Sequence, residues 1–169
     1  MAQWADREID AARSMMRRLL WSLNPESGSI GWGAPEALGE TMARHEGLAA
    51  DFSASLIALI ADEELFLENE ELQKDVLWGI GRLAESRPNL ALRAAPALLP
   101  FLASPDAAKR GLAAWASGLL EYPEAVPALR TLLHDDASLR IYRDEKLESC
   151  RVQDLARAAL ERMERKERR

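Results

Sequence analysis

Two glutamates, Glu36 and Glu40, are four positions apart and supply the helical carboxylates of a candidate binding cluster. Side chains four positions apart lie on one face of a helix, so both carboxylates would point the same way. A polar, glycine-rich stretch, residues 24–33, comes just before them. The candidate binding residues of this region are Asn24, Glu26, Ser27, Trp32, Glu36 and Glu40.

This cluster has two interpretations. A polar loop above the start of a helix could hold a small ligand. Alternatively, the loop is a structural cap over the first helix pair, and Glu36 only complements the positive end of the helix dipole. The spacing of Gly28, Gly31 and Gly33 matches no phosphate-binding pattern, and these glycines do not follow a strand. We favour the structural cap and keep the ligand pocket as the alternative.

Two tryptophans, Trp78 and Trp115, hold the same place in the similar segments WGIG and WASG. Tryptophan is enriched among the residues that dominate binding energy at protein interfaces. Stacked along a groove, the two side chains would anchor a helix or an apolar side chain of a partner. The alternative is that both only pack between neighbouring repeats.

No other residues have the spacing of a catalytic or metal site. His45, His134 and Cys150 are far apart in the sequence and fit no zinc pattern. The acidic connector, residues 62–71, lacks the Asp/Asn-Gly-Glu order of a calcium loop, so we interpret it as solvated, with its three apolar residues docked on the core. We therefore predict no catalytic residue, no cofactor and no metal, and favour a non-enzymatic protein.

Apolar residues at three- and four-residue spacing predict helices along almost the whole chain. Residues 24–33 would form an ordered loop whose Ile30 and Trp32 pack against the first helix pair. Asn89 would cap the fifth helix, which Pro96 and Pro100 would bend or shorten. The predicted helices span residues 3–23, 35–44, 48–61, 70–86, 89–103, 106–121, 123–134 and 152–167, with Asp106 as the N-cap of the sixth.

The segment before the last helix has a different pattern. Apolar and polar residues alternate on both sides of a charged centre in LRIYRDEKLESCRV, residues 139–152. Alternation of this kind is typical of strands. We predict a small β-hairpin with strands near 139–142 and 147–150, and a lone hairpin must lean on helices for stability.

Two kinds of helix recur along the chain. APALLPFL at 95–102 matches VPALRTLL at 126–133, with a weaker copy at 55–60. The second helices match through WGIG at 78–81, WASG at 115–118, EALG at 36–39 and, more distantly, AALE at 158–161. Small residues in this motif would let neighbouring helices approach closely. The pattern predicts helix pairs that stack and shield one another.

The P-A-L-x-x-L-L first helix and the A-W-A-S-G-L-L second helix resemble the HEAT-repeat family, in particular the short repeats of phycobilisome lyases. The stretch from Trp21 to Glu40 and the hairpin are similar to a small group of uncharacterised bacterial HEAT-like proteins. The resemblance implies an all-α fold, a right-handed α-solenoid of about four helix pairs whose second helices line a concave face. It covers most of residues 48–134 well and the two ends loosely, and it transfers no catalytic residue. We expect one HEAT-like repeat domain over residues 1–169.

Composition limits the classes of partner. The chain has 169 residues and a formal charge of −6, which argues against a general nucleic-acid binder. One cysteine fits a reducing compartment, and there is neither a signal peptide nor a stretch of ~18 apolar residues, so we expect a cytoplasmic protein without a membrane segment.

The function that these observations favour is a protein-interaction module or scaffold, with Trp78 and Trp115 on the concave face holding a protein or peptide. The first alternative is a small-molecule or chromophore-binding, lyase-like protein with a pocket at residues 24–40. A DNA-glycosylase-like activity is a further alternative that the acidic charge disfavours. A homodimer through exposed repeat ends is also an open alternative.

Overall fold

Helices form most of the regular structure, and the chain divides into two units at Arg93 and Ala94. The structure, a computed structural model, describes residues 8–143 and 145–168. The first expected helix, residues 3–23, is described from residue 8 onward. None of the described helices is both long and apolar enough to cross a membrane. The expectation of one domain over residues 1–169 stays a prediction.

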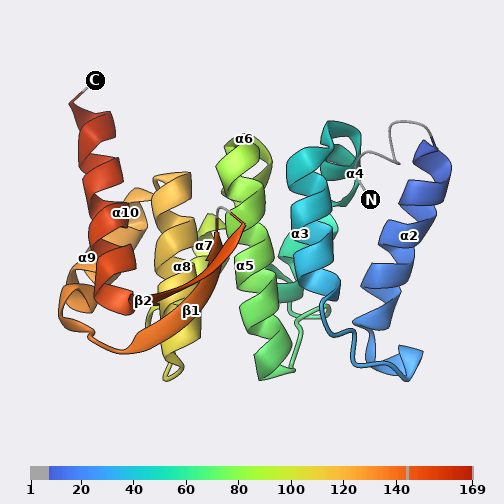
Figure 1. Cartoon of the computed structure of the whole chain (residues 1–169), viewed down its shortest axis with the longest axis horizontal. Helices are drawn as coiled ribbons and strands as arrows, with labels where there is room; N and C mark the ends of the chain where they lie inside the picture. Colours follow the sequence, from blue (N-terminus) through green and yellow to red (C-terminus); the bar gives the residue numbers. More distant parts are fainter. Residues whose placement is uncertain (1–7, 144, 169) are drawn as a thin grey trace. The chain divides into compact units, whose positions relative to one another are not determined.

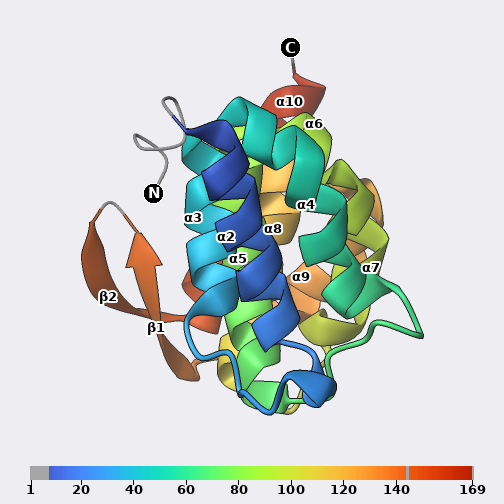
Figure 2. The same cartoon turned by 90° about the vertical axis from the view of Figure 1, so that its right-hand side faces the viewer.

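Unit 1 contains two antiparallel helix pairs. The first pair is α2 and α3, and the second is α4 and α5, with the short helix α6 after it (Figures 1 and 2). Helix α3 packs along α5, while α2 packs against α4, so the pairs stack in order. The bounds are α2 Ile9–Ser22, a 3-10 turn Pro25–Ser27, α3 Ala34–Arg44, α4 Glu46–Ala61, α5 Glu70–Ser86 and α6 Pro88–Ala91.

Unit 2 repeats this plan and adds the hairpin. Helix α7 pairs with α8, α9 pairs with α10, and α8 packs along α10. The hairpin crosses α8 (Figure 1), where Leu139 of β1 fills the space beside Gly111. The bounds are α7 Ala95–Leu102, α8 Ala107–Leu120, α9 Val126–Thr131, β1 Ser138–Arg143, β2 Lys146–Arg151 and α10 Val152–Glu167; 3-10 turns span Leu92–Ala94, Pro123–Ala125 and Leu132–His134.

The predicted all-α fold of about four HEAT-like helix pairs with a small hairpin is therefore confirmed, and its handedness stays a prediction. The hairpin pairs Leu139 with Cys150 and Tyr142 with Leu147, as the alternation indicated. The predicted cap of the sixth helix is also confirmed, because Asp106 Oδ1 accepts hydrogen bonds from the backbone N–H groups of Ala108 and Lys109 at 2.7 and 3.1 Å.

The prediction that Asn89 caps a helix over 89–103 is wrong, whereas the expected shortening of that helix is confirmed, because α7 spans only Ala95–Leu102. The chain instead forms α6, then a 3-10 turn, then α7. Arg87 is the N-cap and Pro88 the first residue of α6, so Asn89 lies inside that helix. Proline is favoured in the first turn of a helix, because its missing N–H has no helical partner there. Pro96 opens α7 in the same way, and so the prolines divide the segment in two.

The expected packing of Ile30 and Trp32 is also wrong, since these side chains are 53% and 62% exposed. Gly31 takes the inner position, and a Cβ there would lie 2.8 Å from the carbonyl oxygen of Ser22. Its φ of +72° also favours glycine. With Gly31 against the end of α2, its two neighbours point outward. In the connector, Leu67 is buried as expected, whereas Leu65 and Phe66 are exposed.

Small residues bring the second helices together in the same register in both units. A Cβ on Gly39 of α3 would lie 2.5 Å from the Cα of Gly79 in α5. A Cβ on Gly118 of α8 would likewise lie 2.5 Å from the Cβ of Ala159 in α10. In both cases the fourth residue of one repeated motif meets the second residue of the next. The repeats predicted from sequence therefore make the same helix–helix contact in both units.

We expect Gly39→Val to lower the free energy of unfolding by ~3 kcal/mol, because α3 and α5 would have to move apart and lose packing. Ala50→Val on the exposed side of α4 is the matched control and should cost only ~0.5 kcal/mol of helix propensity. Urea denaturation followed by circular dichroism measures both. Equal costs for the two variants would contradict the close contact.

Candidate functional site

The candidate residues Glu36 and Glu40 lie where α3 packs along α5 in unit 1. Glu36 shares a hydrogen bond with Asp75, one turn before the contact of Gly39 with Gly79. Glu40 Oε2 accepts a hydrogen bond from Arg82 Nε at 2.6 Å, just after that contact. Asp75 and Arg82 are seven residues apart and share one face of α5. We call these four charged residues the carboxylate strip.

Trp78 lies on this same face of α5, between Asp75 and Arg82, and its side chain is half-buried. The structure thus brings together three of the predicted site residues, Glu36, Glu40 and Trp78, in unit 1. Trp78 borders the carboxylate strip.

The Glu36–Asp75 contact holds a proton near neutral pH. Burial raises the pKa of Asp75 to about 7, and the carboxylate of Glu36 adds to the rise through its charge and its hydrogen bond. Glu36 Oε2 is buried and has no hydrogen-bond partner among the described residues. A protonated Asp75 can donate a hydrogen bond to the side chain of Glu36. The pair therefore behaves as one carboxylic acid beside one carboxylate.

The other half of the strip is an ion pair. Burial alone would raise the pKa of Glu40, but hydrogen bonds from Arg44 and Arg82 outweigh this effect and hold the pKa below its usual range. Arg82 also lies 3.3 Å from Glu85 and donates a hydrogen bond to Ser86, both farther along α5. These bonds fix Arg82 across the seam between α3 and α5. The ion pair therefore links α3 to α5.

The polar side chains of the loop bond to the loop itself. Asn24 Oδ1 accepts a hydrogen bond from the backbone N–H of Glu26 at 2.8 Å. Ser27 Oγ accepts one from Ser29 N at 3.1 Å, and Ser29 Oγ accepts one from Gly31 N at 3.2 Å. The carboxylate of Glu26 is exposed. These bonds favour the interpretation of residues 24–33 as a structural cap rather than as a ligand pocket.

Exposed apolar side chains gather at one edge of unit 1. Helices α3 and α5 run parallel, because Glu36 meets Asp75 and Glu40 meets Arg82, so the loops before them lie at the same edge (Figures 1 and 2). Five large side chains in or next to these loops are 43–62% exposed. They are Trp21, Ile30, Trp32, Leu65 and Phe66, and we call them the apolar edge.

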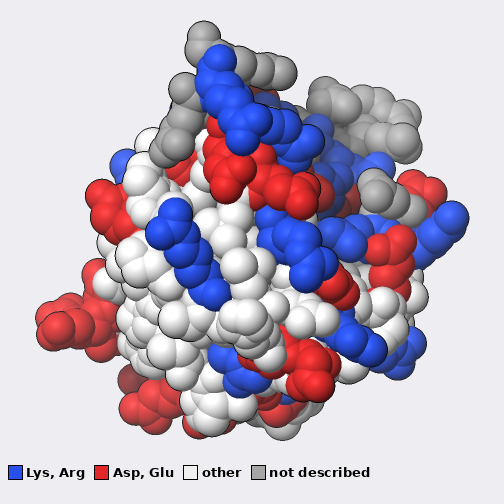
Figure 3. Space-filling view, turned by 90° about the vertical axis from the view of Figure 1, so that its left-hand side faces the viewer, with Lys and Arg blue, Asp and Glu red and all other residues white. Residues whose placement is uncertain are grey.

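The two units differ in net charge. Residues 1–93 contain sixteen acidic and nine basic side chains, a net charge of −7. Residues 94–169 contain twelve acidic and thirteen basic side chains, a net charge of +1. Figure 3 faces the end of unit 2 that bears α9 and α10, and groups of Lys and Arg side chains stand out in its upper half. In unit 1, in contrast, the exposed carboxylates of the 62–71 connector flank Leu65 and Phe66 of the apolar edge in the sequence.

Trp115, the last of the predicted site residues, is in unit 2 and is only 7% exposed. It belongs to α8, three residues before Gly118, and Trp78 has the same place relative to Gly81 in α5. Both tryptophans therefore occupy equivalent places in second helices. A groove that joins them would span both units and stays a prediction.

Comparison with known protein families now gives the repeats a name. A family model of the HEAT-like repeat matches residues 70–116, which run from the start of α5 into α8 and include both Trp78 and Trp115. The chain therefore contains a HEAT-like repeat over these residues. Searches of curated proteins and of solved structures found no match. HEAT-like repeats generally serve as protein-interaction or scaffolding elements.

Two residues outside the predicted set, Asp75 and Arg82, complete the carboxylate strip of unit 1. Sequence reasoning missed them because their role depends on the neighbouring helix and not on a local motif. The repeat alignment contained a usable signal: once Gly39 meets Gly79, residues one turn earlier on both helices must meet as well, and these are Glu36 and Asp75.

The remaining candidate ligands are His45 in unit 1 and His134 and Cys150 in unit 2. His45 Nδ1 caps α4 by accepting a hydrogen bond from Leu48 N at 3.1 Å. Burial raises the pKa of the Cys150 thiol, which disfavours the thiolate that nucleophilic chemistry needs. Within residues 8–143 and 145–168, no three His, Cys, Asp or Glu side chains gather as a metal site would require.

We expect the free energy of unfolding to fall as pH rises from about 4 to above 7, because a raised carboxyl pKa stabilises the fold only while its proton is bound. This contribution is fully present below the ordinary value of 3.8 and is lost as pH passes about 7. After allowance for solvent screening, Asp75→Asn should remove about 1–2 kcal/mol of this pH dependence.

The measurement is urea denaturation at pH 5.5 and at pH 8.5. Glu63→Gln, which removes an exposed carboxylate of the connector, is the control and should keep the wild-type pH dependence. If Asp75→Asn keeps it as well, Asp75 and Glu36 do not share a proton.

Proposed function

We propose that this chain is a non-enzymatic protein-interaction module and that unit 1 binds a basic, amphipathic segment of a partner protein through its apolar edge. The observation that carries the proposal is the exposure of five large apolar side chains at one edge, 43–62% each. Large apolar side chains that stay exposed at one edge of a folded protein are typical of interaction sites. Two of the five are tryptophans, the residue type most enriched in binding hot spots.

The charge around the apolar edge supports a basic partner. Glu26 lies in the first loop, and Asp62, Glu63, Glu64 and Glu68 lie in the second; all five are exposed. Unit 1 as a whole has a net charge of −7. Complementary charge steers association and rejects acidic partners, while apolar anchors supply most of the affinity.

The other surfaces considered for this role have less support. Trp115 is buried and offers a partner little area. Trp78 is half-buried beside the carboxylate strip, so it stays a secondary candidate for a contact on the second-helix face. The alternative of a chromophore pocket at residues 24–40 is weakened because the loop's polar groups bond to one another. A cytoplasmic location and a homodimer remain expectations.

A designed helical peptide of leucine and lysine tests the proposal, with a leucine–glutamate peptide as the matched probe of opposite charge. We expect the lysine peptide to bind more tightly and its affinity to fall with added salt. Trp32→Ser and Phe66→Ser should each weaken binding about tenfold, or about 1.4 kcal/mol, without loss of stability. Fluorescence anisotropy of labelled peptides measures the affinities.

Leu92→Ser is the control. Leu92 is 52% exposed in unit 1 but follows the far end of α5, away from the apolar edge. Its substitution should leave peptide affinity unchanged. Equal binding of the two peptides, or an equal loss with Leu92→Ser, would overturn the proposal.

A further inference from the structure

A cavity of about 230 Å³ in unit 2 combines a cationic mouth with an apolar floor. It lies between α8 and α10, and the end of β1 contributes to its wall. Arg143, Arg162 and Arg165 supply its charge. The floor is formed by Trp115, Gly118, Leu119, Leu155, Ala158 and Ala159. We call this cavity the arginine pocket.

The guanidinium groups of the pocket keep unused donors. Arg143 Nη2 lies 3.2 Å from Glu148 Oε2, but its Nε is buried without a hydrogen-bond partner among the described residues. Arg165 Nε donates to the backbone oxygen of Glu161 at 3.2 Å, and no described carboxylate pairs with this side chain. Because a guanidinium group carries five N–H donors, both side chains have donors beyond these contacts that an incoming anion would engage.

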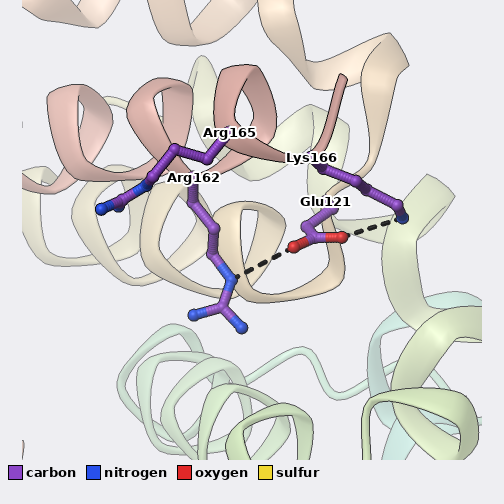
Figure 4. A pocket seen from close by; sticks show the side chains of 4 residues that line it. All are labelled: Glu121, Arg162, Arg165 and Lys166. Atoms are coloured by element: carbon purple, nitrogen blue, oxygen red, sulfur yellow. Dashed lines mark ion pairs between the residues drawn. The ribbon is translucent and has the colours of Figure 1, made fainter. Parts of the chain in front are cut away.

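A second cavity of about 480 Å³ adjoins the arginine pocket, because Arg162 and Arg165 line both. Figure 4 shows Arg162 and Lys166 turned toward Glu121, while Arg165 extends away from it. The ion-pair distances to the Glu121 carboxylate are 3.6 Å from Arg162 Nε and 2.8 Å from Lys166 Nζ. One carboxylate therefore serves two cations there, and the mouth of the arginine pocket keeps a positive charge.

We propose that the arginine pocket binds an amphiphilic organic anion, an apolar chain or ring that ends in a carboxylate or a phosphate. The planar guanidinium fork of arginine matches both of these anions. The apolar body of the ligand would lie against Leu119 and Ala158, the less buried residues of the floor, and Arg143 and Arg165 would hold its charged end. This small-molecule site is separate from the apolar edge of unit 1, whose proposed partner is basic.

Titration calorimetry with octanoate and octyl phosphate tests the proposal, and octanol and acetate probe the two halves of the ligand separately. We expect at least one of the two amphiphilic anions to bind at least tenfold more tightly than either octanol or acetate. The comparison of octanoate with octyl phosphate identifies the preferred head group. If neither anion binds more tightly than both half-probes, the proposal fails.

Substitutions place the binding in the pocket. Arg165→Gln and Arg143→Gln should each weaken the tighter anion about tenfold, since each removes a charged donor. Ala158→Phe fills the floor from an exposed position on α10 and should block binding while every charge is kept. Arg157→Gln, on α10 but outside the pocket, is the matched control and should have no effect.

The same set separates this proposal from the proposed function. Trp32→Ser at the apolar edge should leave anion binding unchanged, and Arg165→Gln should leave binding of the lysine peptide unchanged. Circular dichroism checks that each variant is folded, and the exposed site of Arg165 makes its variant the safest. Unchanged anion affinity in both Arg165→Gln and Ala158→Phe would overturn the arginine pocket as the site.

Discussion

The contact between the backbones of neighbouring second helices is the constraint on which both units depend. Where α3 meets α5, the contact of Gly39 with Gly79 leaves no room for a side chain at Gly39. Where α8 meets α10, the contact of Gly118 with Ala159 likewise leaves no room for one at Gly118. Close approach lets the apolar faces of the helices exclude water along their length. It also fixes the register, because a shift of one residue would place a larger side chain at the crossing point.

The shared register explains why equivalent positions carry different chemistry in the two units. One turn before the crossing, unit 1 has the carboxyl pair Glu36 and Asp75, whereas the equivalent residues of unit 2, Trp115 and Leu155, line the arginine pocket. After the crossing, both units have a Glu–Arg ion pair: Glu40 with Arg82, and Glu121 with Arg162. A repeat architecture thus keeps the crossing constant and lets the flanking positions diverge.

The two units differ in the partners that their surfaces fit. Unit 1 has a net charge of −7 and an apolar edge bordered by carboxylates, a combination suited to a basic protein segment. Unit 2 is nearly neutral overall, yet it gathers three arginines over an apolar floor. The two proposed sites, one for a basic protein segment and one for a small anion, would therefore not compete, because neither surface suits the ligand of the other.

The sequence by itself determined the helices, the hairpin and the repeats, because these depend on the local spacing of apolar, small and capping residues. It also identified Glu36, Glu40 and Trp78, which the fold brings to one face. The tertiary structure alone decided that Asp75 and Arg82 complete that face, that Trp115 is buried, and that Ile30 and Trp32 are exposed. Such contacts join residues tens of positions apart, and the register between helices, which local spacing does not encode, selects them.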